Sequence, residues 1–141
     1  MEIKQSIIEI AKELPNWFTK EAITKISKNL EKFPFIVNNE KEVSGFLIYD
    51  LKKSKCNILW MAVRKSNQRK GIGKRLISEL VKICKKNNIS KIHVDTLADT
   101  EDYGPYKITR KFYLSQGFYK LKVISRGYSE GSDKLILEKK L

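Results

Sequence analysis

The sequence predicts an α+β fold whose mixed, mostly antiparallel sheet contains one parallel pair of strands. Three apolar runs separated by short polar turns lie between residues 35 and 63, which indicates an antiparallel meander. A segment with helical spacing follows and leads into another apolar run, and such a strand–helix–strand connection places its two strands parallel. A second helical segment and two final apolar runs complete the pattern.

Two helices are expected before the sheet. The first covers about residues 4–13 and is ended by Pro15, since proline cannot continue a helix. The second begins after Thr19, whose hydroxyl is a favourable N-terminal cap, and extends to about Lys32. The apolar residues of both segments recur at helical spacing: Ile7, Ile8, Ile10, Ala11 and Leu14 in the first, and Ile23, Ile26 and Leu30 in the second.

The sheet and the later helices follow from the same patterns. Strands are expected at Phe35–Val37, Val43–Leu51, Cys56–Val63, Lys91–Leu97, Tyr119–Arg126 and Lys134–Lys140. The helix between the third and fourth strands covers Ile72–Lys86, and its apolar stripe must pack on the sheet. Pro105 suits the first turn of a last helix that reaches about Ser115 and ends at Gly117. No linker or repeat interrupts residues 1–141, so we expect a single domain.

The composition indicates a folded protein with a basic surface. The hydrophobic fraction of 41% is normal for a globular domain, and the net charge is +13. Basic residues are spread along the chain without the aromatic-interleaved motif of a nucleic-acid-binding module, so we expect a solvated lysine-rich surface that also attracts polyanions. No apolar run is long enough to span a membrane, and Met1–Gln5 lacks a signal-peptide pattern. Cys56 and Cys84 lack metal-ligand spacing, so buried thiols in a cytoplasmic, metal-free protein are expected.

The turn before the Ile72–Lys86 helix has the features of an anion-binding site. It reads Gln68-Arg69-Lys70-Gly71-Ile72-Gly73-Lys74 and joins an apolar run to a helix start. The first N–H groups of a helix have no acceptor within the helix, and its dipole favours negative charge there. Gly71 and Gly73 allow the backbone to approach a ligand closely. The turn therefore predicts a phosphate or pyrophosphate site.

Spacing excludes two of the known phosphate-binding motifs. A Walker P-loop requires glycine where Gln68 stands and Ser or Thr where Arg75 stands. A dinucleotide fingerprint requires a third glycine at the position of Leu76. The remaining pattern, Gln/Arg-x-x-Gly-x-Gly, is carried by Gln68, Gly71 and Gly73.

In this setting the pattern resembles the acyl-CoA loop of the GNAT family of N-acetyltransferases. Phe112–Phe118, with a tyrosine followed four residues later by Gly-Phe, resembles the end of a helix in the same family. Together the two motifs cover Ile58–Phe118, about the central half of the chain. The resemblance implies an α/β/α sandwich with the parallel pair at the centre of the sheet, the GNAT acyl-CoA acyltransferase fold. The family's usual first strand, before the first helix, is short or absent here.

The resemblance also implies how acetyl-CoA would bind. Met61, Ala62 and Val63 would hydrogen-bond its pantetheine arm through their backbone. Backbone N–H groups of the glycine turn would hold the pyrophosphate, which assigns to the coenzyme site Gln68, Arg69, Lys70, Gly71, Ile72, Gly73 and Lys74. Met61, Ala62 and Val63 are also explained as core residues of a strand. Both interpretations can hold, because the ligand would bind their backbone while their side chains pack in the core. Many family members carry a coenzyme-contacting asparagine where this chain has Tyr106.

The chain contains one candidate for the general acid and several for the general base. Tyr113 is predicted to be the general acid, because a phenol with a pKa near ~10 is protonated at neutral pH and can protonate a leaving thiolate; the alternative is an ordinary core tyrosine. Some family members have a glutamate base where this chain has Asn57, which cannot accept a proton. His93 alternates with apolar residues, so we expect a packing histidine. The remaining candidates for the base are an ordered water, Asp95, Asp99, Glu101 and Asp102.

Asp99, Glu101 and Asp102 have a second predicted role. They form an acidic loop after the parallel strand, where a substrate could meet them. Such a cluster would attract a cationic amine, although an acidic loop is also explained as ordinary solvated surface. These three residues are therefore candidates for binding the amine substrate.

The sequence thus predicts an N-acetyltransferase that transfers the acetyl group of acetyl-CoA to a primary amine by direct transfer in a ternary complex, releasing coenzyme A. The acceptor is a small-molecule or protein amine whose identity the sequence leaves open, as it does the use of other acyl-CoAs. One alternative is a catalytically silent acyl-CoA sensor, since Asn57 replaces the glutamate base of some family members. Another is a basic nucleic-acid-binding module, which would bind DNA or RNA with steep salt dependence. We expect a monomer or homodimer without a membrane partner.

Overall fold

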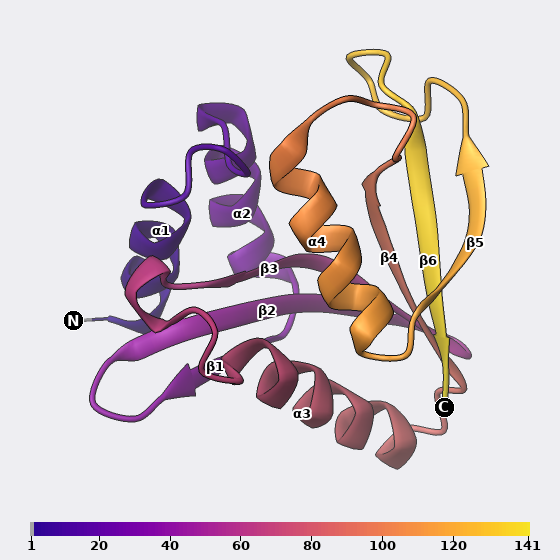
Figure 1. Ribbon diagram of the computed structural model, residues 1–141. Coiled ribbons are helices and arrows are strands. Elements are labelled where there is room, and N and C mark those ends of the chain that lie inside the picture. Colours follow the sequence, from indigo (N-terminus) through magenta and orange to yellow (C-terminus); the bar gives the residue numbers. More distant parts are fainter. Residues whose placement is uncertain (1) are drawn as a thin grey trace.

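A computed structural model describes residues 2–141 (Figure 1). A six-stranded sheet with the strand order β1-β2-β3-β4-β6-β5 forms its centre. In chain order the elements are α1 (Ile3–Lys12), α2 (Lys20–Lys32), β1 (Phe35–Asn39), β2 (Val43–Lys52), β3 (Lys55–Val63), the short 3-10 helix η1 (Lys65–Asn67), α3 (Ile72–Lys86), β4 (Lys91–Leu97), α4 (Gly104–Ser115), β5 (Tyr119–Ile124) and β6 (Lys134–Lys140).

The predicted fold class is confirmed. β3 and β4 are parallel, and every other neighbouring pair in the sheet is antiparallel. The crossover helix and both of its flanking strands lie where the hydrophobic pattern places them. Thr19 caps α2, since its hydroxyl accepts a hydrogen bond from the Ala22 N–H at 3.1 Å.

Two strand ends differ from the prediction by two residues, and the end of β2 and the start of β3 each differ by one. β1 continues to Asn39, because Asn38 and Asn39 still pair with β2, although their composition is typical of a turn. β5 ends at Ile124 instead of Arg126. Arg126 has a φ of +53°, in the left-handed region, and therefore cannot continue a strand.

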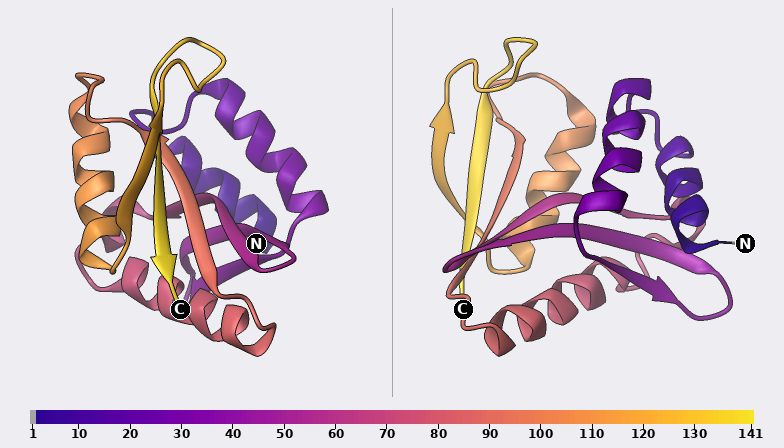
Figure 2. Two further views of the ribbon diagram at one scale, coloured as in Figure 1. Left: turned by 90° about the vertical axis from the view of Figure 1, so that its right-hand side faces the viewer. Right: turned by 180° about the vertical axis from the view of Figure 1, so that it is seen from behind.

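The helices form layers on both faces of the sheet. Phe46 and Ile48 of β2 pack in one apolar cluster with α1 and α2, whereas Leu47 and Tyr49 point to the other face and pack with α3 and α4. Figure 2 shows α1 and α2 on the side of the sheet opposite to α3. This alternation is what period-two strands buried on both faces require.

The apolar stripe of α3 holds the larger cluster together. Ile72, Leu76, Ile77, Leu80 and Cys84 are all buried against the sheet. Their burial confirms the predicted stripe. None of the helices within residues 2–141 is both long and apolar enough to span a membrane.

Candidate active site

The two parallel strands separate after a short ladder and form a fork. The ladder runs from Lys55 paired with Lys91 to Ile58 paired with Val94. Beyond it, β3 remains paired with β2, and β4 remains paired with β6. We call the gap between Leu59–Val63 and the end of β4 the fork. Over the described part of the chain, the β4-facing edge of β3 has no strand partner here, so its N–H and C=O groups are available to an extended ligand.

A bulge at the base of the fork sets which side chains face it. The register between β2 and β3 shifts where Tyr49 pairs with Ile58 and Ile48 pairs with Trp60, which leaves Leu59 unpaired. As a result Met61 shares the α3 and α4 face, while Trp60 packs with α1 and α2 on the other face. The bulge therefore turns the thioether of Met61 toward α4.

Tyr113 reaches from α4 to Met61. Its side chain is only 6% exposed, and its ring forms edge-to-face contacts with Phe112 and Phe118, with ring centres 5.3 Å apart in both pairs. Its hydroxyl donates to Met61 Sδ at 3.7 Å. Burial raises the pKa of the Tyr113 phenol well above its usual value. The phenol is therefore protonated at neutral pH and lies beside a sulfur atom at the fork.

The two glycines at the start of α3 have different structural roles. Gly71 is the N-cap of α3 with a left-handed φ of +79°, and a Cβ added there would meet open space. Gly73 lies within the helix, and an added Cβ would be 2.9 Å from Phe112 Cζ and 3.4 Å from Met61 Cε. Gly71 thus leaves the helix start open, whereas Gly73 allows α3 to pack closely against α4. The second role was not expected from the sequence.

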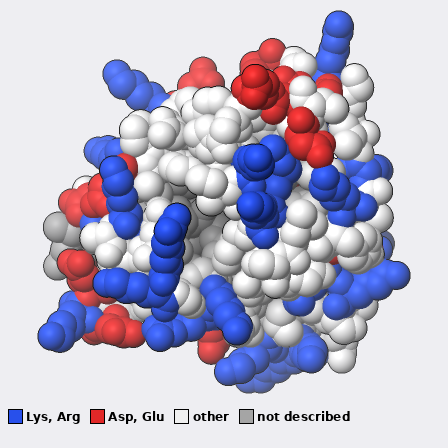
Figure 3. Space-filling model, viewed as in Figure 1, with Lys and Arg blue, Asp and Glu red and all other residues white. Residues whose placement is uncertain are grey.

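Other residues of the loop tie it to β3 and surround it with positive charge. The Gln68 side-chain amide donates to the Val63 carbonyl at 3.2 Å, which fixes the loop to the end of β3. Arg69, Lys70 and Lys74 are formal cations in or next to the loop. Figure 3 shows a hollow between this loop and α4, with Lys and Arg side chains on both sides of it. The hollow is therefore suited to a polyanion.

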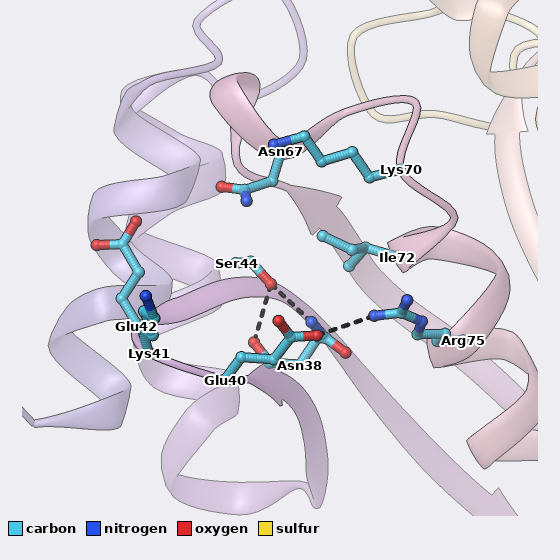
Figure 4. Close-up of a pocket in the computed structure, with 9 residues that line it drawn as sticks. All are labelled: Asn38, Glu40, Lys41, Glu42, Ser44, Asn67, Lys70, Ile72 and Arg75. Carbon is cyan, nitrogen blue, oxygen red and sulfur yellow. Dashed lines mark hydrogen bonds and ion pairs between the residues drawn. The ribbon is translucent and has the colours of Figure 1, made fainter.

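A separate cavity of about 510 Å³ lies between the β1–β2 turn and the loop before α3 (Figure 4). Lys70 and Ile72 line it from the loop. Arg75 also lines it and pairs with Glu40 at 3.1 Å, while Ser44 forms hydrogen bonds with Asn38. No residue of the fork lines this cavity, so it is distinct from the hollow next to α4.

The acidic loop is not brought together with Tyr113. Asp99 pairs with Lys120 at 2.7 Å, and this ammonium holds the pKa of the Asp99 carboxyl below its usual value. A carboxylate oxygen of Glu101 accepts the Asp133 N–H at 3.0 Å, and Asp102 is exposed. These residues line a cavity of about 550 Å³ that contains no residue of the fork. Two of the three acidic side chains therefore already have partners within the chain.

A row of polar residues crosses the opposite face of the sheet. His93 Nε2 lies 2.6 Å from Glu138 Oε2, and the Tyr119 hydroxyl donates to the other carboxylate oxygen of Glu138. His93 is therefore a partnered packing histidine, as expected. Asn57 pairs with His93 across the parallel ladder and lies in the same row.

Asp95 follows on this face as the first β4 residue beyond the ladder. Its side chain is 48% exposed, and its carboxylate is 3.6 Å from Lys134 Nζ. Lys134 Nζ also lies 5.0 Å from the centre of the Tyr128 ring. Of the acidic candidates for the base, Asp95 is the one that the strand register places at the fork.

Two features of the site had no signal in the sequence. Tyr106, for which the resemblance implied the position of a coenzyme contact, donates to the Trp17 carbonyl at 3.4 Å. The Trp17 indole donates to Thr109 Oγ1 at 3.0 Å, so the segment between α1 and α2 is bound to α4. The second feature is the Thr96 hydroxyl, which is buried at the fork without a partner. Both depend on contacts between residues far apart in the sequence.

Comparisons with known proteins identify the family and the fold. The model of the acetyltransferase (GNAT) domain family matches residues 31–120. A search of curated proteins finds no significant match.

Within residues 2–141 no group of three or more His, Cys, Asp or Glu side chains is placed to hold a metal ion.

Several solved structures share the fold. A protein of Desulfovibrio desulfuricans assigned to the GNAT family has a TM-score of 0.86 and 19% identity, covering 98% of this chain and 92% of its own. The alanine N-acetyltransferase of a ribosomal protein from Escherichia coli has a TM-score of 0.75 and 16% identity, with coverage of 99% and 90%. An aminoglycoside 6′-N-acetyltransferase in complex with coenzyme A has a TM-score of 0.74 and 14% identity, with coverage of 97% and 89%. The family match, the topology of the sheet and the glycine loop agree, and the chain belongs to the GNAT family of acetyltransferases.

Proposed function

We propose that the protein transfers the acetyl group of acetyl-CoA to a primary amine by direct transfer in a ternary complex. The observation that carries the proposal is that the start of α3, the fork strand β3 and the Tyr113 phenol are in contact with one another. Gly73 at the start of α3 lies against Phe112 and Met61, and Met61 in turn accepts the hydrogen bond of Tyr113. A coenzyme whose pyrophosphate lies at the N-terminus of α3 would therefore have its thioester in the fork, next to the phenol.

The chemistry of the donor side follows from this placement. An amine attacks the thioester carbonyl, the C–S bond breaks, and the thiolate needs a proton. Tyr113 would supply it, because its phenol is neutral and its present hydrogen-bond acceptor is already a sulfur atom. The backbone of Met61, Ala62 and Val63 would hold the pantetheine arm along the free edge of β3.

The acceptor would enter from the opposite face of the fork. Asp95 is the first β4 residue beyond the ladder and is half-exposed on this face, and we propose it, directly or through a water, as the acceptor of the amine proton. Recognition of a cationic amine by Asp99, Glu101 and Asp102 stays a prediction. Because Asp99 and Glu101 have internal partners, exposed Asp102 is the residue whose change to Asn tests it best.

Direct transfer is favoured by the state of the cysteines. Cys56 and Cys84 are both fully buried, and burial raises the pKa of both thiols. A covalent acyl-enzyme requires an accessible thiolate. We therefore expect mass spectrometry to find no acetyl group on either cysteine after incubation with acetyl-CoA alone; a stoichiometric acetyl-cysteine would contradict direct transfer.

The test of the proposed function is coenzyme A release in the presence of a panel of amines, combined with titration calorimetry of acetyl-CoA. Binding together with amine-dependent release supports the transferase. Binding without release from any amine supports the acyl-CoA sensor. Weak acetyl-CoA binding together with steeply salt-dependent binding of DNA or RNA supports the nucleic-acid module.

The pH profile provides a further prediction. Because the pKa of Tyr113 is raised, the phenol stays protonated as pH rises, and loss of the acid is not expected below about pH 10. The amine acceptor becomes more nucleophilic as it loses its proton. The rate should therefore increase with pH and reach a plateau. A decline centred near pH 8 that disappears in Tyr113→Phe would contradict a raised pKa.

Charge reversal tests the loop as a polyanion site. Lys70→Glu is expected to weaken acetyl-CoA binding about tenfold at low salt, because an attractive charge becomes repulsive. Lys85→Glu is the matched control, since Lys85 is exposed in the last turn of α3, at the opposite end of that helix from the loop that carries Lys70. Calorimetry at two salt concentrations distinguishes them. Equal affinities for both variants would remove Lys70 from the site.

A further inference from the structure

Thr96 carries an unsatisfied hydroxyl at the fork. Its side chain is 2% exposed, and Oγ1 is the one fully buried side-chain N or O atom without a hydrogen-bond partner in the part of the chain that the structure describes. Buried polar atoms in native proteins are almost always hydrogen-bonded, so each exception requires an explanation. Valine has nearly the same shape and would avoid the unsatisfied group.

The strand register places this hydroxyl on the donor side of the fork. Thr96 lies two residues beyond Val94, where the ladder with β3 ends. Alternation along β4 puts Thr96 on the face of Val94, which packs in the cluster that includes Tyr113. Met61, the acceptor of the Tyr113 hydrogen bond, faces the same cluster from β3. Thr96 and Met61 therefore flank the fork on the side that α4 covers.

Arg110, the buried cation near Thr96, does not provide an acceptor for the Thr96 hydroxyl. Arg110 of α4 is buried, and its guanidinium donates to the carbonyl of Leu97, the residue after Thr96, at 2.7 Å. A guanidinium has no acceptor atom, so it could only donate to Thr96, and no such hydrogen bond is present. The Thr96 O–H thus has no acceptor within the described residues.

We infer that the Thr96 hydroxyl is a hydrogen-bond partner of the acyl-pantetheine arm of the coenzyme. This inference rests on the proposed function, because it places that arm in the fork. The arm carries amide groups and ends in a thioester carbonyl, and a threonine hydroxyl can bond to either. The free protein then contains a buried group that only the bound coenzyme satisfies, so Thr96 lowers the stability of the free protein and contributes to affinity.

Thr96→Val tests the inference, because it removes the hydroxyl and keeps the volume. The dissociation constant should rise about three- to tenfold, the usual effect of one neutral hydrogen bond. The Tm of the free variant should stay equal or rise by about 3 °C, since an unsatisfied buried group is removed. A merely structural threonine predicts the reverse, with a lower Tm and unchanged affinity.

Two ligands and two further variants complete the experiment. Weaker binding of both coenzyme A and acetyl-CoA assigns the hydrogen bond to an arm amide, and weaker binding of acetyl-CoA alone assigns it to the thioester carbonyl. If Thr96→Val does not fold, Thr96→Ser and Thr96→Ala give the same comparison, because only serine keeps the hydroxyl. Thr100→Val is the matched control, since that hydroxyl donates to Asp133 at 2.7 Å.

The outcomes separate this inference from the proposed function. A parent protein that binds neither ligand would overturn both. A parent that binds acetyl-CoA, with Thr96→Val affinities equal to the parent for both ligands, would overturn the role of Thr96 alone. Affinity loss in Thr96→Val with a preserved or raised Tm supports it.

Discussion

Replacement of Tyr113 by Phe is expected to lower kcat by about 10²–10⁴-fold, the usual contribution of a general acid. The change removes one O–H group and keeps the ring, which is packed between Phe112 and Phe118. The hydroxyl donates its hydrogen bond to the thioether of Met61, a weak acceptor, so its loss costs little stability. Steady-state kinetics, calorimetry of acetyl-CoA and thermal unfolding should therefore show a defect confined to kcat.

Two comparisons make this prediction specific. Tyr103→Phe removes a phenol that donates to the Asn16 carbonyl outside the fork, and we expect its kcat to stay within a few-fold of the parent. An activated thioester, whose thiolate needs less protonation, should restore much of the rate of Tyr113→Phe. If Tyr113→Phe keeps full kcat with acetyl-CoA, Tyr113 is a core tyrosine, and solvent is the acid.

The fold was largely predictable because its signals are local. The apolar stripe of Ile72–Lys86 and its glycine start define the crossover helix, and a strand–helix–strand connection then requires the parallel pair. The strand ends were less predictable. Asn38 and Asn39 have the composition of a turn, but pairing with β2 keeps them extended. Tertiary pairing outweighs propensity at such positions.

The parts of the candidate site that lie on continuous segments were also predictable as positions. Gly71 and Tyr113 belong to short motifs, and the structure places the helix start next to Phe112, the neighbour of Tyr113. Their roles remain proposals. The Thr96 hydroxyl could not be recognised, because its lack of a partner depends on the end of the ladder and on the packing of α4.

The pairing of the acidic loop could not be predicted from the sequence either. Its composition suggests free carboxylates, but Lys120 and the Asp133 N–H, both distant in the sequence, bind two of them. Composition reports which charges are present and not which are already paired. Asp95, one of several candidates by sequence, stands out only because the register places it at the fork.

The second large effect is expected at Gly73. Gly73→Asp and Gly73→Asn add side chains of nearly equal size, and in both the new Cβ would lie about 2.9 Å from Phe112 Cζ. Both variants should therefore lose similar stability, about 1–3 kcal/mol for overpacking. Thermal unfolding of the two free variants measures this loss of stability, which both share because the new side chain forces α3 away from α4.

Only Gly73→Asp adds a negative charge at the start of α3, where the coenzyme pyrophosphate is proposed to lie. Two unit charges about 6 Å apart at an effective dielectric constant of about 20 repel by roughly 3 kcal/mol. We therefore expect acetyl-CoA to bind Gly73→Asp more than tenfold more weakly than Gly73→Asn, a difference above ~1.4 kcal/mol. The difference should shrink at high salt, because ions screen it. Equal affinities in two folded variants would mean that the phosphates lie elsewhere, and that Gly73 serves only the contact between α3 and α4.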